Sequence, residues 1–332
     1  MRGLNRPIII FLIFFITAQA IIPEEGKTSF SFYASPSLIA GSGFEYVLEY
    51  DVTKSRLDWP LLPAGGLAAN AEFKLKKGLY LSFFSSFIIP SYSGQMFDYD
   101  YLNSSDPSML THFSEHKSYI RQGMDFSFNL GWVKPLIVYK TSANKTIKIH
   151  CGPSLGIRYI LNSWAAIDGY LKYPPNTNPP SSVLPDTPIV PQSGIGVTYK
   201  QYFILPSIGI LFRFELPEEW NLDLMTRLCS NAIGEAEDIH YKRSLKFKDI
   251  FKTKSFSFYL YFSTEKRFSK YFSFFSSIDY TAIIAYNGKT FEYKVSGLGN
   301  PDILLNTYNT GSAGSVLHSA HLNLGIGFHL GK

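Results

Sequence analysis

Apolar and polar residues alternate along most of the chain with a period of two, the period of a β-strand. The segment near the C-terminus shows this most clearly, because one face is apolar and the other carries histidine, asparagine and glycine. The apolar face consists of Leu322, Leu324, Ile326, Phe328 and Leu330. A barrel strand between lipid and a polar interior needs this pattern, and a strand of a soluble sandwich also has it. The alternation therefore predicts strands and leaves their architecture open.

The connections between these segments favour a membrane barrel. Short turns alternate with long polar loops, and outer-membrane barrels have their short turns at the periplasmic end and their long loops outside the cell. We therefore predict an all-β fold, a transmembrane antiparallel up-and-down β-barrel of about ten strands with long extracellular loops. The expected strands are 28–50, 57–76, 79–92, 117–133, 145–162, 197–215, 220–234, 250–265, 271–286 and 317–330. The expected short turns are 77–78, 135–145, 217–219 and 266–270, and the expected loops are 51–56, 93–116, 163–196, 235–249 and 287–316.

Residues 1–20 have the features of a cleaved signal peptide. Two arginines precede an uncharged apolar core at 8–16, and Ala18-Gln19-Ala20 fits the small-x-small cleavage pattern. The apolar core is too short to span a bilayer. We expect an exported mature chain, residues 21–332, that forms a single barrel domain.

Composition narrows the function classes. The formal net charge of +5 falls to +3 when the two arginines of the signal peptide are removed, which gives no support to nucleic-acid binding. With 28 Phe and 22 Tyr the chain is too aromatic for a disordered protein. No run of eighteen apolar residues follows the signal peptide, so no transmembrane helix is expected. Cys151 and Cys229 lie in strand-like segments, and we expect two free thiols rather than a bridge.

Two short acidic stretches carry the candidate chemistry. Asp98 and Asp100 are two residues apart, as are Asp238 and His240, so each pair shares one side of an extended backbone. Two close carboxylates push their pKa values apart, and a carboxylate beside an imidazole raises its basicity. With the N-terminus on the periplasmic side, both stretches fall in loops at the extracellular rim. If they face each other across the mouth, they form a site that can activate water for hydrolysis.

Other interpretations of these residues stay open. Paired acids in a loop are often only solvated charges, and three carboxylates with one imidazole suit several divalent cations. The barrel mouth is also compatible with an adhesin or receptor-binding surface on which catalysis has been lost. A small pore is a third hypothesis, and bulky inward Tyr, Arg and Gln side chains argue against a wide channel in a barrel of about ten strands.

Five patches of the chain are more specific. They are Ser55-Arg56-Leu57-Asp58-Trp59, Gly94 to Asp100 with Ser104-Ser105-Asp106-Pro107, Tyr199 to Phe203 with Pro206, Ile208 and Gly209, Glu237 to Tyr241, and more weakly Gly41 to Val47. In this order they resemble the omptin family of outer-membrane endopeptidases, and the resemblance spans nearly the whole mature chain. It implies a ten-stranded barrel integral to the outer membrane of a Gram-negative-type cell, with its site facing outside.

The resemblance implies roles for the two acidic stretches. Asp98, Asp100, Asp238 and His240 take the positions of the catalytic residues of an aspartic-type omptin endopeptidase. In this scheme Asp238 orients and charges His240, which acts as general base on a water molecule. Asp98 and Asp100 flank that water on the opposite wall, and one of them keeps a proton for the developing oxyanion.

The resemblance also implies a pocket for a basic residue before the cleaved bond. Glu45 matches one acid of that pocket, whereas the family's second acid is replaced by Ala236. Glu235 and Glu237 flank the gap, so we name Glu237 with Glu45 as candidate substrate-binding residues. We therefore expect cleavage beside Arg or Lys, with a preference weakened by the missing acid.

The implied partners follow from the same resemblance. We expect peptide or protein substrates, contact with outer-membrane lipid, a monomer, and no nucleic acid. The resemblance implies no metal and no other cofactor, but omptins need lipopolysaccharide for activity. A basic flank at 242–254 is a candidate contact for lipid phosphates, or else a solvated surface.

Overall fold

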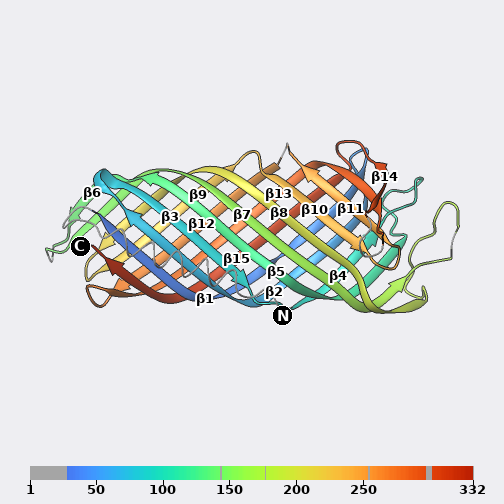
Figure 1. Cartoon of the computed structure of the whole chain (residues 1–332), viewed down its shortest axis with the longest axis horizontal. Helices are drawn as coiled ribbons and strands as arrows, with labels where there is room; N and C mark the ends of the chain where they lie inside the picture. The colour runs from blue at the N-terminus through green and yellow to red at the C-terminus, as the bar shows by residue number, and fades with distance from the viewer. Residues whose placement is uncertain (1–27, 143, 176, 253–254, 297–300, 332) are drawn as a thin grey trace.

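The computed structural model describes residues 28–331 apart from 143, 176, 253–254 and 297–300, so the expected signal peptide lies outside the described residues. The described part consists of strands joined by turns, with one short 3₁₀ turn, η1 (Lys76–Gly78) (Figure 1). The strands are β1 (Ser29–Glu49), β2 (Val52–Lys74), β3 (Leu79–Ile88), β4 (Ser91–Asp100), β5 (His112–Trp132), β6 (Lys134–Lys140), β7 (Thr146–Lys172), β8 (Ile189–Leu216), β9 (Trp220–Cys229), β10 (Ile233–His240), β11 (Leu245–Phe251), β12 (Ser255–Arg267), β13 (Phe272–Lys294), β14 (Ile303–Thr307) and β15 (Ala313–Leu330). None of the described residues forms a helix long and apolar enough to cross a membrane.

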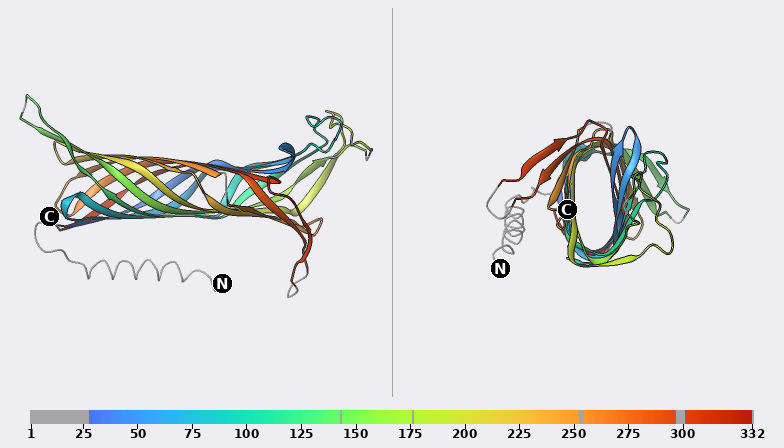
Figure 2. Two further views of the ribbon diagram at one scale, coloured as in Figure 1. Left: turned by 90° about the horizontal axis from the view of Figure 1, so that it is seen from above. Right: turned by 90° about the vertical axis from the view of Figure 1, so that its right-hand side faces the viewer.

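The sheet closes on itself because the first strand pairs with the last (Figure 2). The pairings run from β1 through β2, β3, β5, β7, β8, β9, β12, β13 and β15 and return to β1, which makes a ring of ten strands in the described part of the chain. The pairings around this ring are antiparallel. The predicted all-β antiparallel barrel is therefore confirmed.

The orientation of side chains agrees with a barrel whose outer face meets lipid. On β15, Leu322, Leu324 and Ile326 are exposed on the outside, whereas His321 and Asn323 are buried inside. Neighbouring strands show the same division, so an apolar band surrounds the barrel while its interior is polar.

The barrel has an outer tier that the alternation did not reveal. Each of the expected strands 79–92 and 220–234 is divided in two, into β3 and β4 and into β9 and β10. Above the breaks, β4 pairs with β2 and β5, β10 pairs with β8 and β11, and β11 pairs with β13. Pro90 lies in the first break, where it needs no backbone N–H for the ladder. The ring thus continues outward with β4, β10 and β11 in place of β3, β9 and β12.

The predicted bounds of the long loops were therefore too wide. The expected loops 93–116 and 235–249 contain most of β4, β10 and β11, and the expected loops 163–196 and 287–316 contain the ends of β7, β8, β13 and β15 together with β14. Beyond the lipid band both faces of a strand carry polar residues, so hydrophobic alternation fades there. Both acidic stretches consequently lie in paired strands, which hold side chains more rigidly than loops do.

Ion pairs fill the interior below this tier. Arg158 donates both ends of its guanidinium to Asp125, from Nε at 2.8 Å, and its Nη2 lies 3.3 Å from Asp279. Arg213 donates to Glu72 at 2.6 Å and to Asp223 from Nε at 2.9 Å. These buried charges are compensated by direct pairing, as buried charges must be.

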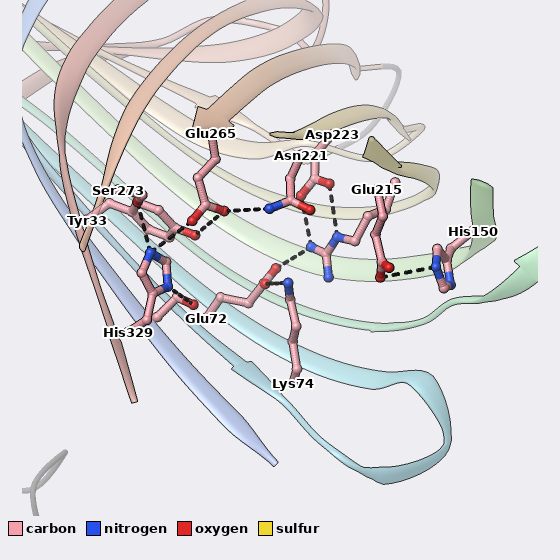
Figure 3. Close-up of polar contacts among 12 residues, drawn as sticks. Tyr33, Glu72, Lys74, His150, Glu215, Asn221, Asp223, Glu265, Ser273 and His329 are labelled. Carbon is pink, nitrogen blue, oxygen red and sulfur yellow. Dashed lines mark hydrogen bonds and ion pairs between the residues drawn. The ribbon is translucent and has the colours of Figure 1, made fainter. Parts of the chain in front are cut away.

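A second network lies toward the periplasmic end (Figure 3). Glu265 accepts a hydrogen bond from Tyr33 at 3.3 Å and lies 2.9 Å from His329 and 3.1 Å from Arg267. His329 also contacts Ser273 at 2.8 Å. The cavity between this network and the Arg213 pairs is about 30 Å³, which holds only a water molecule or two. A lumen packed in this way disfavours the small-pore hypothesis.

Candidate active site

Strands β4 and β10 carry the two acidic stretches, with the candidate catalytic side chains on the face toward the lumen. On β10, Gly234, Ala236, Asp238 and His240 are buried, while the residues between them are more exposed. On β4, Asp98 is buried and lies opposite Leu57 of β2 and Ser114 of β5. Residues two apart therefore share a face in both strands, as the spacing predicted.

Asp238 and His240 form a directly bonded pair. His240 Nε2 lies 2.6 Å from Asp238 Oδ2, and the other ring nitrogen, Nδ1, contacts Nη2 of Arg243. An arginine can only donate, so Nδ1 is the acceptor and a neutral ring carries its proton on Nε2, toward Asp238. The edge of Phe247 packs against the imidazole, with ring centroids 5.7 Å apart. The pair thus holds the ring in one tautomer and one orientation.

Asp98 and Asp100 form a coupled carboxylate pair. Burial, and then the charge of Asp100, raise the pKa of Asp98 well above its usual range. Burial also raises the pKa of Asp100. Ser55 Oγ donates a long hydrogen bond of 3.4 Å to Asp98 Oδ1. Repulsion between neighbouring carboxyls opposes the ionisation of both, so one of them tends to keep a proton.

The two pairs lie within electrostatic reach of each other. The charge of Asp238 raises the pKa of Asp98, and the charge of His240 lowers the pKa of Asp100. The charge of Arg243 lowers the pKa of both carboxyls of the β4 pair. Arg243 is therefore bonded to His240 and lies within electrostatic range of Asp98 and Asp100.

Glu45 lies on the lumen side near the two candidate catalytic pairs, and Glu237 does not. Glu45 on β1 is 3% exposed, and burial, followed by the charges of Asp238, Asp249 and Asp98, raises its pKa well above the usual range. Glu237 is on the outer face of β10, where its carboxylate lies 3.9 Å from Lys246 Nζ. The structure therefore brings Glu45 to the candidate site and places Glu237 on the opposite side of the strand.

Three stacked aromatic rings lie beneath the acids. Trp59 and Tyr199 stack at 5.6 Å with an interplanar angle of 11°, and Trp164 lies 6.0 Å from Tyr199. All three are fully buried. Tyr199 lies opposite Asp238 in the β8–β10 ladder, so this aromatic layer borders the Asp238–His240 pair.

Sequence reasoning missed three residues that the structure places here: Arg243, Tyr173 and Asp249. Arg243 was included in a basic flank because nothing in its spacing connects it to His240. Burial, then the charges of Asp98 and Asp100, raise the pKa of Tyr173 to about 12, so its phenol lies within electrostatic range of the β4 pair. Among the described residues, no three His, Cys, Asp or Glu side chains are arranged as a metal-ligand set.

Comparison with known proteins identifies the family. The model of the omptin family matches residues 27–329. The chain belongs to the omptin family. The plasminogen activator of Yersinia pestis is 24% identical over 246 residues, which cover 73% of this chain and 72% of that protein. The outer-membrane protease OmpT of Escherichia coli superposes with a TM-score of 0.76 at 16% identity, over 91% of this chain and 97% of that one.

The family assignment confirms several expectations from the sequence. This omptin has the all-β outer-membrane barrel fold, and it is integral to the outer membrane with the mouth that carries the candidate site facing outside. Its similarity to outer-membrane proteases places it in a protease family.

Proposed function

We propose that this chain is an endopeptidase that hydrolyses peptide bonds of substrates outside the cell, with water activated between the Asp238–His240 pair and the Asp98–Asp100 pair. The observation that carries this proposal is the 2.6 Å bond from His240 Nε2 to Asp238 on one wall, with the coupled carboxyls of β4 on the other. A base oriented by a carboxylate, facing a carboxyl that keeps a proton, is the combination that water attack on an amide needs.

The proposed reaction uses each group once. His240 Nδ1 takes a proton from water, and the resulting hydroxide attacks the carbonyl carbon of the peptide. The shared proton of Asp98 and Asp100 stabilises the oxyanion and is available for the leaving nitrogen. Arg243 occupies Nδ1 in this structure, so its flexible side chain must turn aside for water to reach the imidazole. We propose that the carboxylate of Asp238 stabilises the imidazolium that forms.

We propose peptides and proteins cut beside basic residues as the substrates. Glu45 supports this, because a buried carboxylate beside the catalytic groups suits a cationic side chain. The name plasminogen activator describes the relative from Yersinia pestis, and its substrate is not carried over to this chain. For this chain we propose only the chemical class, a polypeptide with Arg or Lys before the cleaved bond.

The coupled carboxyls predict how activity falls at high pH. Because burial and mutual repulsion raise the pKa of Asp98, its proton persists above the pH at which an ordinary aspartic acid ionises. Activity that needs this proton is complete below the raised pKa and is lost as pH rises through it. We expect Asp100→Asn, which removes the neighbouring charge, to shift the alkaline limb of the kcat/KM profile to lower pH. An unchanged alkaline limb would contradict the assignment.

A peptidase assay on the refolded barrel tests the proposed function. We expect peptides with a single Arg or Lys to be cleaved in the presence of lipopolysaccharide, with little effect of chelators or serine-protease reagents. Omission of lipopolysaccharide tests the lipid requirement. Abolition by chelator with rescue by added metal would favour a metal mechanism. Folded barrel that cleaves no basic peptide under either lipid condition, but binds host surfaces, would favour the adhesin alternative.

A further inference from the structure

The hairpin of β10 and β11 places an acid opposite the position where the sequence lacks one. Ala236 pairs with Asp249 across this ladder. Both residues are buried, at 2% and 5% exposure, on the same face as Asp238. Directly opposite residues of an antiparallel pair have Cβ atoms about 4.5–5.5 Å apart. The carboxyl of Asp249 therefore projects into the space beside the methyl group of Ala236.

A chain of hydroxyl groups holds the Asp249 carboxyl in place. Thr290 Oγ1 donates to Asp249 Oδ1 at 2.7 Å, and Ser312 Oγ donates to Thr290 Oγ1 at 2.9 Å. Thr290 is itself buried, and it lies opposite Asp249 in the β11–β13 ladder. This carboxyl is thus oriented before any substrate arrives, which is how a recognition group gains affinity without an ordering cost.

Glu45 on β1 is buried in the same part of the barrel mouth, close enough for its pKa to respond to the charge of Asp249. Its Oε2 is buried and makes no hydrogen bond within the described residues. The charge of Asp249 raises the pKa of Glu45, and burial raises the pKa of Asp249 itself to about 7. Among the described residues, neither carboxyl takes part in an ion pair, whereas the acids deeper in the barrel are matched with arginines. Two buried acids that lack an internal cation are suited to one that comes from outside.

We propose that Asp249 is a specificity-determining residue that, together with Glu45, binds the guanidinium or ammonium group of the basic residue before the cleaved bond. It replaces, from the neighbouring strand, the acid that is missing at Ala236. This inference rests on the proposed peptidase function. A cation between the two carboxyls would form with each of them an ion pair that neither has among the described residues.

Matched substrates test the inference. Peptides that differ only in Arg or its uncharged isostere citrulline before the cut give the preference for charge. We expect Asp249→Asn to lower the ratio of kcat/KM for Arg over citrulline by about tenfold or more, mainly through KM, because a charged hydrogen bond is worth about 1.5–3 kcal/mol. The citrulline peptide should be cleaved at the wild-type rate. Glu237→Gln, which removes a charge from the outer face of β10, should leave the ratio unchanged.

A relocated acid provides the complementary test. Ala236→Asp in the Asp249→Asn background puts a carboxylate back on the opposite strand and should restore the preference for Arg. A ratio that Asp249→Asn leaves unaltered would overturn the inference. Equal losses for both peptides would also overturn it, because they would indicate a structural role.

Binding without turnover separates the pocket from the peptidase function. Agmatine, which carries a guanidinium group, should bind to the folded His240→Ala barrel in calorimetric titrations. Adding Asp249→Asn to that variant should weaken agmatine binding by about tenfold. A wild-type barrel that cleaves no peptide would end the proposed function, and the titration would still decide the pocket. Equal affinity for agmatine with and without Asp249→Asn in the His240→Ala barrel would refute the role of Asp249.

Discussion

Barrels that carry His240→Ala should cleave a basic peptide at least ~100-fold more slowly than the wild type, the usual contribution of a general base. The loss should appear in kcat, with KM little changed, because the imidazole acts on water and the pocket carboxyls are untouched. Asp238→Asn should cause a loss of similar order. Its amide would donate to Nε2, which favours the tautomer with a proton on Nδ1, where the base must accept one. Initial rates at saturating substrate measure both effects.

A histidine away from the site provides the control. His318 on β15 contacts the Tyr280 hydroxyl at 2.9 Å and lies outside the candidate site, so His318→Ala should retain wild-type turnover. Heat-dependent gel mobility shows whether each variant forms the closed barrel. Wild-type turnover in His240→Ala, or an equal loss in His318→Ala, would remove His240 from the mechanism.

The largest effect on stability is expected at Arg158. Arg158→Met leaves Asp125 and Asp279 buried without their shared cation, and breaking a buried pair in this way costs about 3–5 kcal/mol. The Thr281 hydroxyl also loses its donor, now at 2.7 Å. Urea titration of the barrel refolded in lipid vesicles should show a clearly lower unfolding midpoint.

An exposed ion pair of good geometry is the matched control. Lys145 Nζ lies 2.6 Å from Glu218 at the periplasmic turns, and both side chains are at least half exposed. Lys145→Met should leave the midpoint where it is, because solvent screens such pairs. Equal midpoints for wild type and Arg158→Met would mean that the interior network adds nothing to stability.

The sequence was sufficient to predict the inner tier of the barrel. In the lipid band every second residue must be apolar, so the alternation at 322–330 follows from the environment of the strand and is confirmed. The same spacing rule placed Asp98 and Asp100 together, and Asp238 with His240, although the strands themselves were interpreted as loops. Wherever the backbone is extended, residues two apart share a face of the strand, whether or not the other face is apolar.

The outer tier was hidden because its outer face is charged. Glu235 and Glu237 on β10 pair with Lys248 and Lys246 on β11, and the inner face of β10 carries only small or polar residues, so β10 shows no hydrophobic alternation. The turn at 241–244 fixes the register, and through it the pairing of Ala236 with Asp249. Interpretation of 235–249 as a loop therefore also concealed Asp249. Arg243 lies in this turn, and the direction of its side chain follows from the turn conformation, which no periodic pattern predicts.

The central claim, that the two pairs act on one water molecule, is tested most directly by a double-mutant cycle. Turnover is measured for the wild type, Asp98→Asn, His240→Ala and the double variant, all as folded barrels. Residues that act as a unit are strongly non-additive, so the double variant should be no slower than the slower single variant. Losses that multiply, with the double variant slower by the product of the two single effects, would show that the walls act independently and would contradict this mechanism.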